Sequence, residues 1–167
     1  LTAVQNGFAD FAVVSEGAVV PDSLEKQRVG EIQEIPICGT AFPELTQGPV
    51  TLAKLTEYPI VCLATGTSSH DFYSELFLRR KLPFSPDVEV ETIDQVPPVV
   101  RSNLGIGFVP NEMLYGSPEF TGIYPITLEE PITPRSIYLF QRKNQPLSIA
   151  AKHLRQMLLA PTEESDS

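Results

Sequence analysis

The chain has 167 residues, of which 42% are hydrophobic, enough to bury the core of one domain or of two small lobes. Its formal net charge is −9, from 21 acidic and 12 basic side chains. Proteins bind nucleic acids mainly by neutralising phosphates with Lys and Arg, so this net negative charge argues against direct binding to DNA or RNA. Any contact with DNA is therefore expected from a segment outside this sequence.

The two cysteines, Cys38 and Cys62, each lie in an apolar run that is typical of a strand. Neither has a second Cys or a His at metal-ligand spacing, so we interpret both as buried, reduced thiols and not as a disulfide or a metal site. Reduced thiols are typical of a cytoplasmic protein. No apolar run of about eighteen residues and no basic-then-apolar leader is present, so neither a membrane span nor a signal peptide is predicted.

The N-terminal residues predict a short helix over Leu1 to Asn6, with Gly7 at a left-handed C-terminal cap. The chain begins without Met, on what reads as the end of a helix, so we expect a longer protein upstream. Phe8 to Val14 is nearly all apolar, which predicts a parallel strand covered on both faces. We interpret Asp10 in this run as a carboxylate that sets a turn.

The next segment predicts two further strands. Leu24 to Glu34 alternates loosely between polar and apolar residues, as in an exposed strand. Ile35 to Cys38 reads as a buried strand that ends in Gly39 and Thr40. A small polar residue at the end of a buried strand makes Thr40 a candidate cleft residue, with ordinary loop chemistry as the alternative.

The central stretch carries the main candidate site. Thr51 is placed to cap one helical turn, and Tyr58 to Ala64 predicts a buried strand. This strand breaks into the hydroxyl-rich turn Thr65 to Ser69, which opens a helix of about three turns with apolar residues at spacings of three and four. The free N–H groups and the positive dipole end at a helix start suit a carboxylate or phosphate. The alternative is an ordinary N-cap with a capping box.

After this helix, Asp87 to Thr92 alternates as a strand with one solvated carboxylate face. The following helix begins at Asp94, tolerates prolines in its first turn and ends near Ser102 to Gly105. Ile106 to Pro110 predicts a short strand. The remaining prediction is a helical turn capped by Gly116, two strands, a final helix and a disordered acidic tail, over residues 111–115, 120–128, 136–141, 146–158 and 162–167.

Signatures of enzymes and cofactors do not fit the sequence. Gly105-Ile106-Gly107 resembles part of a dinucleotide fingerprint, but Pro110 stands where the third glycine belongs and the order is helix then strand. Ser68, His70 and Asp71 lie within one helical turn and are too close to line up as a catalytic triad. His70 could contact a bound anion or simply face solvent. We expect no catalytic residue, no metal site and no cofactor.

From Gly7 to Met157 the chain resembles the effector-binding domain of LysR-type transcriptional regulators. The resemblance is carried by short pieces in matching order and spacing, over residues 6–14, 35–40, 50–61, 65–69, 99–110, 131–143 and 146–151. It implies an α/β fold of two Rossmann-like lobes, with mostly parallel sheets joined by crossing strands, as in type 2 periplasmic binding proteins.

The resemblance also implies a domain organisation. Lobe I would comprise residues 1–44 and 124–160, lobe II residues 45–123, and residues 161–167 would form the disordered tail. The first lobe would be incomplete at its N-terminus, because such domains begin with a strand, a helix and another strand that are missing here, together with the winged helix-turn-helix that binds DNA.

The function implied by the resemblance is the sensing of a small, anionic metabolite in a cleft between the lobes. Carried over by position, the residues lining this cleft are Thr40, Thr65, Gly66, Thr67, Ser68, Ser69, Ser102, Asn103 and Gly105. The implied partners are the effector, further copies of the chain in a dimer of effector domains and a tetramer of the full protein, and DNA through the missing N-terminal domain only. The alternatives are a stand-alone solute-binding protein of a transporter and an enzyme on the same lobes, for which we find no convergent acid–base pair.

Overall fold

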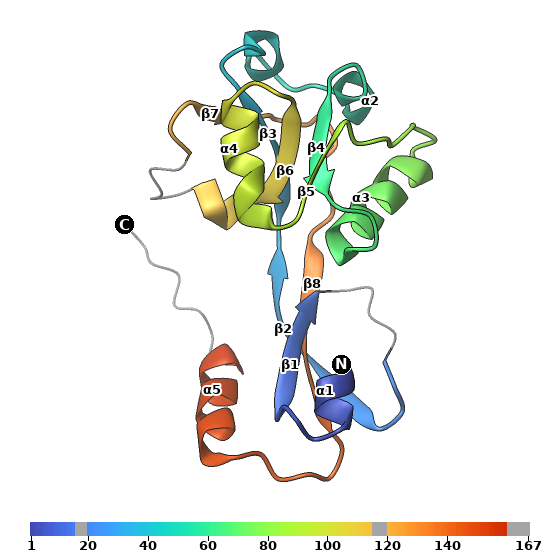
Figure 1. The fold of residues 1–167 in the computed structure, drawn as a ribbon, viewed down its shortest axis with the longest axis vertical. Coiled ribbons are helices and arrows are strands. Elements are labelled where there is room, and N and C mark those ends of the chain that lie inside the picture. Colours follow the sequence, from blue (N-terminus) through green and yellow to red (C-terminus); the bar gives the residue numbers. More distant parts are fainter. Residues whose placement is uncertain (16–19, 115–119, 160–167) are drawn as a thin grey trace. The chain divides into compact units, whose positions relative to one another are not determined.

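The computed structural model describes residues 1–15, 20–114 and 120–159 (Figure 1). Contacts within the chain divide it into two compact units: unit 1 combines Leu1–Glu31 with Arg135–Ser167, and unit 2 is Ile32–Pro134. Residues 32–44 and 124–134 thus group with unit 2, whereas the lobe ranges expected from the sequence assigned them to lobe I. The reason is that the strands in both segments belong to the sheet of unit 2. The predictions for Gly116 and for the acidic tail lie outside the described residues.

Unit 1 is built on a three-stranded sheet in the order β1-β8-β2. Its elements are α1 (Thr2–Gln5), β1 (Phe11–Ser15), β2 (Leu24–Ile32), β8 (Arg135–Arg142) and α5 (Ile149–Leu159). Val4 of α1, Leu24 of β2 and Phe140 of β8 form its buried cluster. The short N-terminal helix is confirmed, as is the left-handed Gly7, whose φ is +79°.

The prediction for residues 8–14 was wrong in two respects. The strand begins only at Phe11, and it pairs antiparallel with β8, with Val13 opposite Leu139. Within the described part of the sheet β1 is an edge strand, so its side chains are at most half-buried, and Val13 remains 45% exposed. An apolar run indicated a strand here without revealing that one edge and part of one face stay open.

Unit 2 is built on a five-stranded sheet in the order β5-β4-β6-β3-β7. The strands are β3 (Glu34–Gly39), β4 (Ile60–Leu63), β5 (Val88–Val90), β6 (Ile106–Pro110) and β7 (Ile123–Pro125), and the helical segments are η1 (Pro43–Thr46), α2 (Leu52–Leu55), α3 (Ser68–Arg79), η2 (Ile93–Gln95), α4 (Val96–Arg101) and η3 (Asn111–Leu114). The strand predicted over 120–128 is therefore much shorter, and the turn at 111 is a 3₁₀ helix.

The sheet of unit 2 is mixed. β4 pairs parallel with β5 and β6, whereas β3 pairs antiparallel with β6 and β7. The predicted preference for parallel pairing holds where α3 and α4 supply the crossover connections that parallel strands need. It fails for β3 and β7, and this difference decides where several predicted site residues lie.

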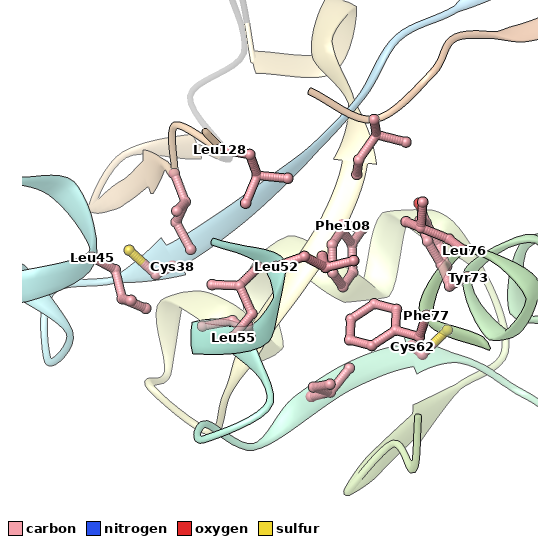
Figure 2. Close-up of a cluster of buried hydrophobic side chains, with 14 residues drawn as sticks. Cys38, Leu45, Leu52, Leu55, Cys62, Tyr73, Leu76, Phe77, Phe108 and Leu128 are labelled. Carbon is pink, nitrogen blue, oxygen red and sulfur yellow. The ribbon is translucent and has the colours of Figure 1, made fainter. Parts of the chain in front are cut away.

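The strands of unit 2 alternate between two buried clusters. On β4, Ile60 and Cys62 face one cluster and Val61 faces the other, as the period of two in a strand requires. Figure 2 shows the first cluster, in which Tyr73 and Phe77 of α3 pack with Phe108 of β6. α4 contributes to the second cluster, so the two longest helices of unit 2 cover opposite faces of its sheet.

Both cysteines lie in the first cluster, buried and without a disulfide, as the sequence indicated (Figure 2). Thr51 caps α2 as predicted, because the Lys54 N–H donates to its Oγ1 at 3.1 Å. Within the described residues, no helix is both long enough and apolar enough to cross a bilayer.

Candidate functional site

Strand direction decides which of the predicted site residues meet. β4 and β6 run parallel, with Val61 opposite Gly107, so their C-terminal ends lie at one edge of the sheet. β3 runs antiparallel to β6, with Glu34 opposite Pro110, so β3 starts at that same edge and ends at the other. We call the edge at which β4 and β6 end the carboxyl edge, and the edge at which they begin the amino edge.

The predicted residues divide between these two edges. The turn Thr65 to Ser69 follows β4 and lies at the carboxyl edge. Thr40 follows β3, and Ser102 to Gly105 precede β6, so both groups lie at the amino edge. The structure therefore brings Thr40 together with Asn103, and it separates both from the hydroxyl-rich turn.

The turn at the carboxyl edge is held by its own hydrogen bonds. Thr67 is the N-cap of α3: its Oγ1 accepts from the His70 N–H at 3.2 Å, and its hydroxyl donates to the Ala64 carbonyl at 2.9 Å. Gly66 has a φ of +90°, which favours glycine at this position of the turn. The alternative interpretation of this turn as an N-cap is therefore confirmed. The capping box that it included is not formed, because the third helical residue is His70 and not Glu or Gln.

Ser68 and Ser69 occupy the first two positions of α3. N–H groups at these positions have no acceptor inside the helix, and they lie at the positive end of the helix dipole. Ser68 is exposed and Ser69 is half-buried. The two residues thus offer backbone N–H groups and side-chain hydroxyls at one place, which suits an oxygen-rich ligand.

Negative charge also lies beside this turn. The Thr65 hydroxyl donates to Oε1 of Glu89 on β5 at 3.0 Å, and its oxygen lies 3.5 Å from Nε2 of His70. Nδ1 of His70 is 3.6 Å from the Asp71 carboxylate, and the imidazole packs on the ring of Phe84. The side chain of His70 is only 16% exposed, so the expectation that it faces solvent was wrong. The ring of Phe84, in the segment between α3 and β5, lies against it with ring centroids 5.5 Å apart.

Glu89 is a neighbour of the turn that sequence analysis did not single out. The signal was present, because residues 87–92 alternate with one carboxylate face and β5 is parallel to β4, pairing Cys62 with Glu89. What the sequence lacked was the pairing of these two strands. Only that pairing shows which carboxylate lies next to Thr65.

The predicted site residues at the amino edge are engaged in contacts within the chain. Asn103, with a left-handed φ of +59°, accepts at Oδ1 from the Ala41 N–H at 2.9 Å, and its Nδ2 is 3.5 Å from Oγ1 of Thr40. Ser102 donates its hydroxyl to the Pro98 carbonyl at 2.9 Å. A Cβ added to the buried Gly105 would lie 2.5 Å from the Pro59 carbonyl oxygen. The Asn103 contacts join the segment after β3 to the segment between α4 and β6. The Ser102 hydroxyl is engaged at the end of α4, and Gly105 is packed against the residue before β4.

Glu34 is a buried charged residue that the sequence placed in an exposed strand. It begins β3 at the carboxyl edge, is 2% exposed, and accepts at Oε2 from the Tyr73 hydroxyl at 2.8 Å. Tyr73 stacks on Phe108 with ring centroids 4.7 Å apart. A loose polar alternation over residues 24–34 gave no sign that its last carboxylate is buried, because α3 covers it only in the folded chain.

The cysteines are held as neutral thiols. Burial raises the pKa of Cys38 to about 11, with the nearby Glu44 charge as a second cause, and burial likewise raises the pKa of Cys62 to about 11. Neither thiol is therefore suited to nucleophilic or redox chemistry at neutral pH. Among the described residues, no group of three His, Cys, Asp or Glu side chains is placed to hold a metal ion.

The sequence of this chain matches the model of a protein family, the LysR substrate binding domain, over residues 1–161, nearly the whole chain. The chain belongs to this family. The resemblance and the type 2 periplasmic-binding-protein-like fold class inferred from the sequence are thereby confirmed. The family is one of ligand-binding domains of regulators, which decides against a solute-binding protein of a transporter.

Solved LysR structures have the same fold. The CcmR regulatory domain of Synechocystis PCC6803 in complex with 2-PG matches with a TM-score of 0.83 at 17% identity, over 99% of this chain and 79% of that one. The effector-binding domain of QuiR in complex with shikimate matches with a TM-score of 0.78 at 19% identity, over 95% and 74%. HinK, a LysR family transcriptional regulator from Pseudomonas aeruginosa, matches with a TM-score of 0.78 at 16% identity, over 95% and 54%.

The present chain thus spans about half the length of HinK, with 54% of that protein covered. A comparison with curated proteins gives no match.

Proposed function

We propose that this chain is the ligand-sensing part of a LysR-type transcriptional regulator, and that its small ligand binds at the carboxyl edge of unit 2, on the turn Thr65 to Ser69. The observation that carries the proposal is the family match over residues 1–161. Two neighbours of the same fold, CcmR and QuiR, were solved with the small molecules 2-PG and shikimate. A small effector is therefore the natural ligand class for this chain.

The chemistry of the turn narrows the ligand further. The N–H groups and hydroxyls of Ser68 and Ser69 favour an anionic or strongly polar oxygen group. Glu89, bonded to Thr65, and Asp71 in the first turn of α3 both add negative charge nearby. We propose a small organic acid of low charge that carries hydroxyls, because Glu89 can accept a hydrogen bond from a hydroxyl but repels a second anionic group.

The residues at the amino edge have a different role in this proposal. Thr40, Ser102, Asn103 and Gly105 lie at the opposite edge from the turn. The side chains of Thr40, Ser102 and Asn103 are engaged in hydrogen-bond contacts within the chain, and Gly105 is closely packed against Pro59. We therefore propose Thr65, Gly66, Ser68 and Ser69 as the ligand contacts. We propose a structural function for Thr67, whose hydroxyl is engaged at the start of α3, and for the four residues at the amino edge. We propose that the chain binds its ligand without catalysing a reaction.

The family match supports a proposal about the partners of the whole protein. We propose that the full regulator works as a homo-oligomer in the cytoplasm and binds DNA through an N-terminal domain. The net charge of −9 supports the proposal that this chain does not itself bind DNA. The ligand can then alter DNA binding only to the extent that it binds one arrangement of the regulator more tightly than another.

The Ser68→Pro variant tests the binding turn. Proline is tolerated at the first helical position, and Thr67 before it already has the extended backbone that proline requires, with φ −87° and ψ 151°. The substitution removes one N–H and one hydroxyl while leaving α3 intact. Shikimate and a panel of small hydroxy acids are screened by thermal shift, and the affinity of each hit is measured by calorimetry.

We expect Ser68→Pro to weaken binding of a hit by roughly tenfold or more, the worth of one to two hydrogen bonds. Ser102→Ala at the amino edge is the matched control and should leave the affinity unchanged. A hit that binds wild type and Ser68→Pro equally well would refute the assignment of the turn. A hit weakened only by Ser102→Ala would move the site to the amino edge.

A further inference from the structure

His70 lies beside the proposed effector turn and connects it with two carboxylates. Its ring nitrogen Nε2 is 3.5 Å from Oγ1 of Thr65, and its Nδ1 is 3.6 Å from the carboxylate of Asp71. The Thr65 hydroxyl in turn donates to Oε1 of Glu89 on β5 at 3.0 Å. The imidazole therefore stands between Asp71 of its own helix and the pair formed by Thr65 and Glu89.

The positions of the protons follow from these contacts. A hydroxyl has one proton, and because Thr65 donates its proton to Glu89, the Thr65 oxygen is left to accept from His70. In the neutral ring, Nε2 of His70 therefore carries the hydrogen. Nδ1 is then the bare nitrogen, and it is buried without a hydrogen-bond partner among the described residues. A proton taken up by this ring is added at Nδ1, on the side of the Asp71 carboxylate.

The charged groups around the imidazole are negative. They are Asp71 from α3 and Glu89 from β5, the latter through the Thr65 hydroxyl, whereas the segment between α3 and β5 contributes the uncharged ring of Phe84. Within the described part of the chain, no Lys or Arg forms an ion pair with either carboxylate. An anion on the turn therefore lies near two negative charges. The start of α3 supplies part of a positive charge, and His70 supplies a whole one when it is protonated.

We propose that protonation of His70 regulates the effector site, so that the turn Thr65 to Ser69 binds an anionic ligand more tightly in acidic than in alkaline solution. This inference rests on the proposed function, because it concerns the same turn. The ligand does not contact the buried Nδ1, and the positive charge acts on it through space. By linkage, the ligand and the proton each favour the binding of the other. Histidine side chains change their charge between about pH 5 and pH 8, so the affinity changes in this range.

Calorimetric titration with shikimate and the small hydroxy acids of the panel, at about pH 5.5 and about pH 8.5, tests the proposal. A carboxylic acid stays ionised over this range, so a change in affinity reports on the protein. We expect a hit to bind at least about threefold more tightly at the lower pH, the effect of one unit charge roughly 7 Å away even at the dielectric constant of water. The methyl ester of the hit is the matched ligand, because it keeps the hydroxyls and lacks the charge, and any binding of the ester should be independent of pH.

Two histidine variants assign the effect. The chain has two histidines, and the other one, His153, is an exposed residue of α5 in unit 1. His70→Gln keeps an amide N–H for Thr65 but gains no charge, so a hit should bind this variant equally at both pH values. His153→Gln should keep the pH dependence of the wild type. Titration of the wild type at about pH 7, in two buffers of different ionisation enthalpy, measures the protons taken up on binding and does not depend on the folding of a variant. We expect the hit to bind with uptake of a fraction of one proton.

The contrary outcomes separate this inference from the proposed function. A hit that loses affinity in Ser68→Pro, but binds the wild type equally at both pH values and without proton uptake, would overturn the role of His70 and leave the proposed function standing. The same pH dependence in His70→Gln as in the wild type would assign the effect to another group and likewise overturn the inference. The absence of any hit at either pH would overturn the proposed function together with the inference that rests on it.

Discussion

Single residues in this protein often hold the fold where the sequence suggested a ligand contact. Thr67 is the best example: its hydroxyl both accepts from the start of α3 and donates to Ala64, so it is occupied before any ligand arrives. Asn103 and Ser102 are similarly engaged at the amino edge. Residue type identified polar groups at strand ends correctly, but it did not reveal which of them are already satisfied by the chain.

Gly105 gives a sharp test of this structural role. A methyl group at this position would lie 2.5 Å from the Pro59 carbonyl oxygen and 3.1 Å from Cγ2 of Val61, in a buried part of the sheet. We expect Gly105→Ala to lower the free energy of unfolding by roughly 1–3 kcal/mol, as overpacking does. Urea denaturation measures the change. Gly48→Ala, where no atom lies within 4 Å of the added carbon, is the control and should be close to neutral.

The cysteine thiols predict a loss of stability at alkaline pH. Their pKa is about 11 in the folded chain, against 9.0 for the ordinary thiol, so the unfolded chain releases these protons first as the pH rises. Below pH 9 the thiols therefore do not change the free energy of unfolding with pH. Between pH 9 and pH 11 that free energy should fall by up to about 2.7 kcal/mol per thiol.

Urea denaturation between pH 8 and pH 11 measures this dependence. Within the range from pH 9 to pH 11, the free energy of unfolding should fall by about 1.4 kcal/mol per thiol for each pH unit. The double variant Cys38→Ala/Cys62→Ala should be less stable at neutral pH but should show a flatter decline. An identical decline in the variant would mean that other groups, such as Tyr58 with its raised pKa, account for the effect.

Among the elements, α3 does the most to position the carboxyl edge. Its start presents the hydroxyl-rich turn, and its buried face carries Tyr73, Leu76 and Phe77 into the first core cluster. The same helix covers Glu34 through the hydroxyl of Tyr73. Helical spacing in the sequence predicted α3 and its apolar face, because that periodicity depends on neighbouring residues only.

The Tyr73→Phe variant tests the contact between α3 and β3. It keeps the ring stacked on Phe108 and removes only the hydroxyl that donates to the buried carboxylate of Glu34. We expect a loss of roughly 1–3 kcal/mol in the free energy of unfolding, because a buried carboxylate loses a hydrogen bond. Chemical denaturation measures it. Tyr124→Phe, at a ring that is 48% exposed, should change stability little, and an equal loss in both variants would argue against a special role for the buried pair.

At the scale of the whole molecule, the chain forms two units, of which one is discontinuous in sequence. Unit 2 is one continuous segment, Ile32–Pro134, and unit 1 is completed by residues from both ends of the sequence. The proposed effector turn belongs to the continuous unit 2.

The sequence by itself determined the family, the nature of most elements and the burial of both cysteines. The helix at Ser68, the N-cap at Thr51 and the strand Ile106–Pro110 were all predicted, because propensity, capping and periodicity are properties of short stretches. The tertiary structure alone decided that β3 is antiparallel to β6, that Thr40 is therefore far from the Thr65 turn, and that Glu89 lies beside it. Strand pairing joins residues distant in sequence, and no local pattern records its direction.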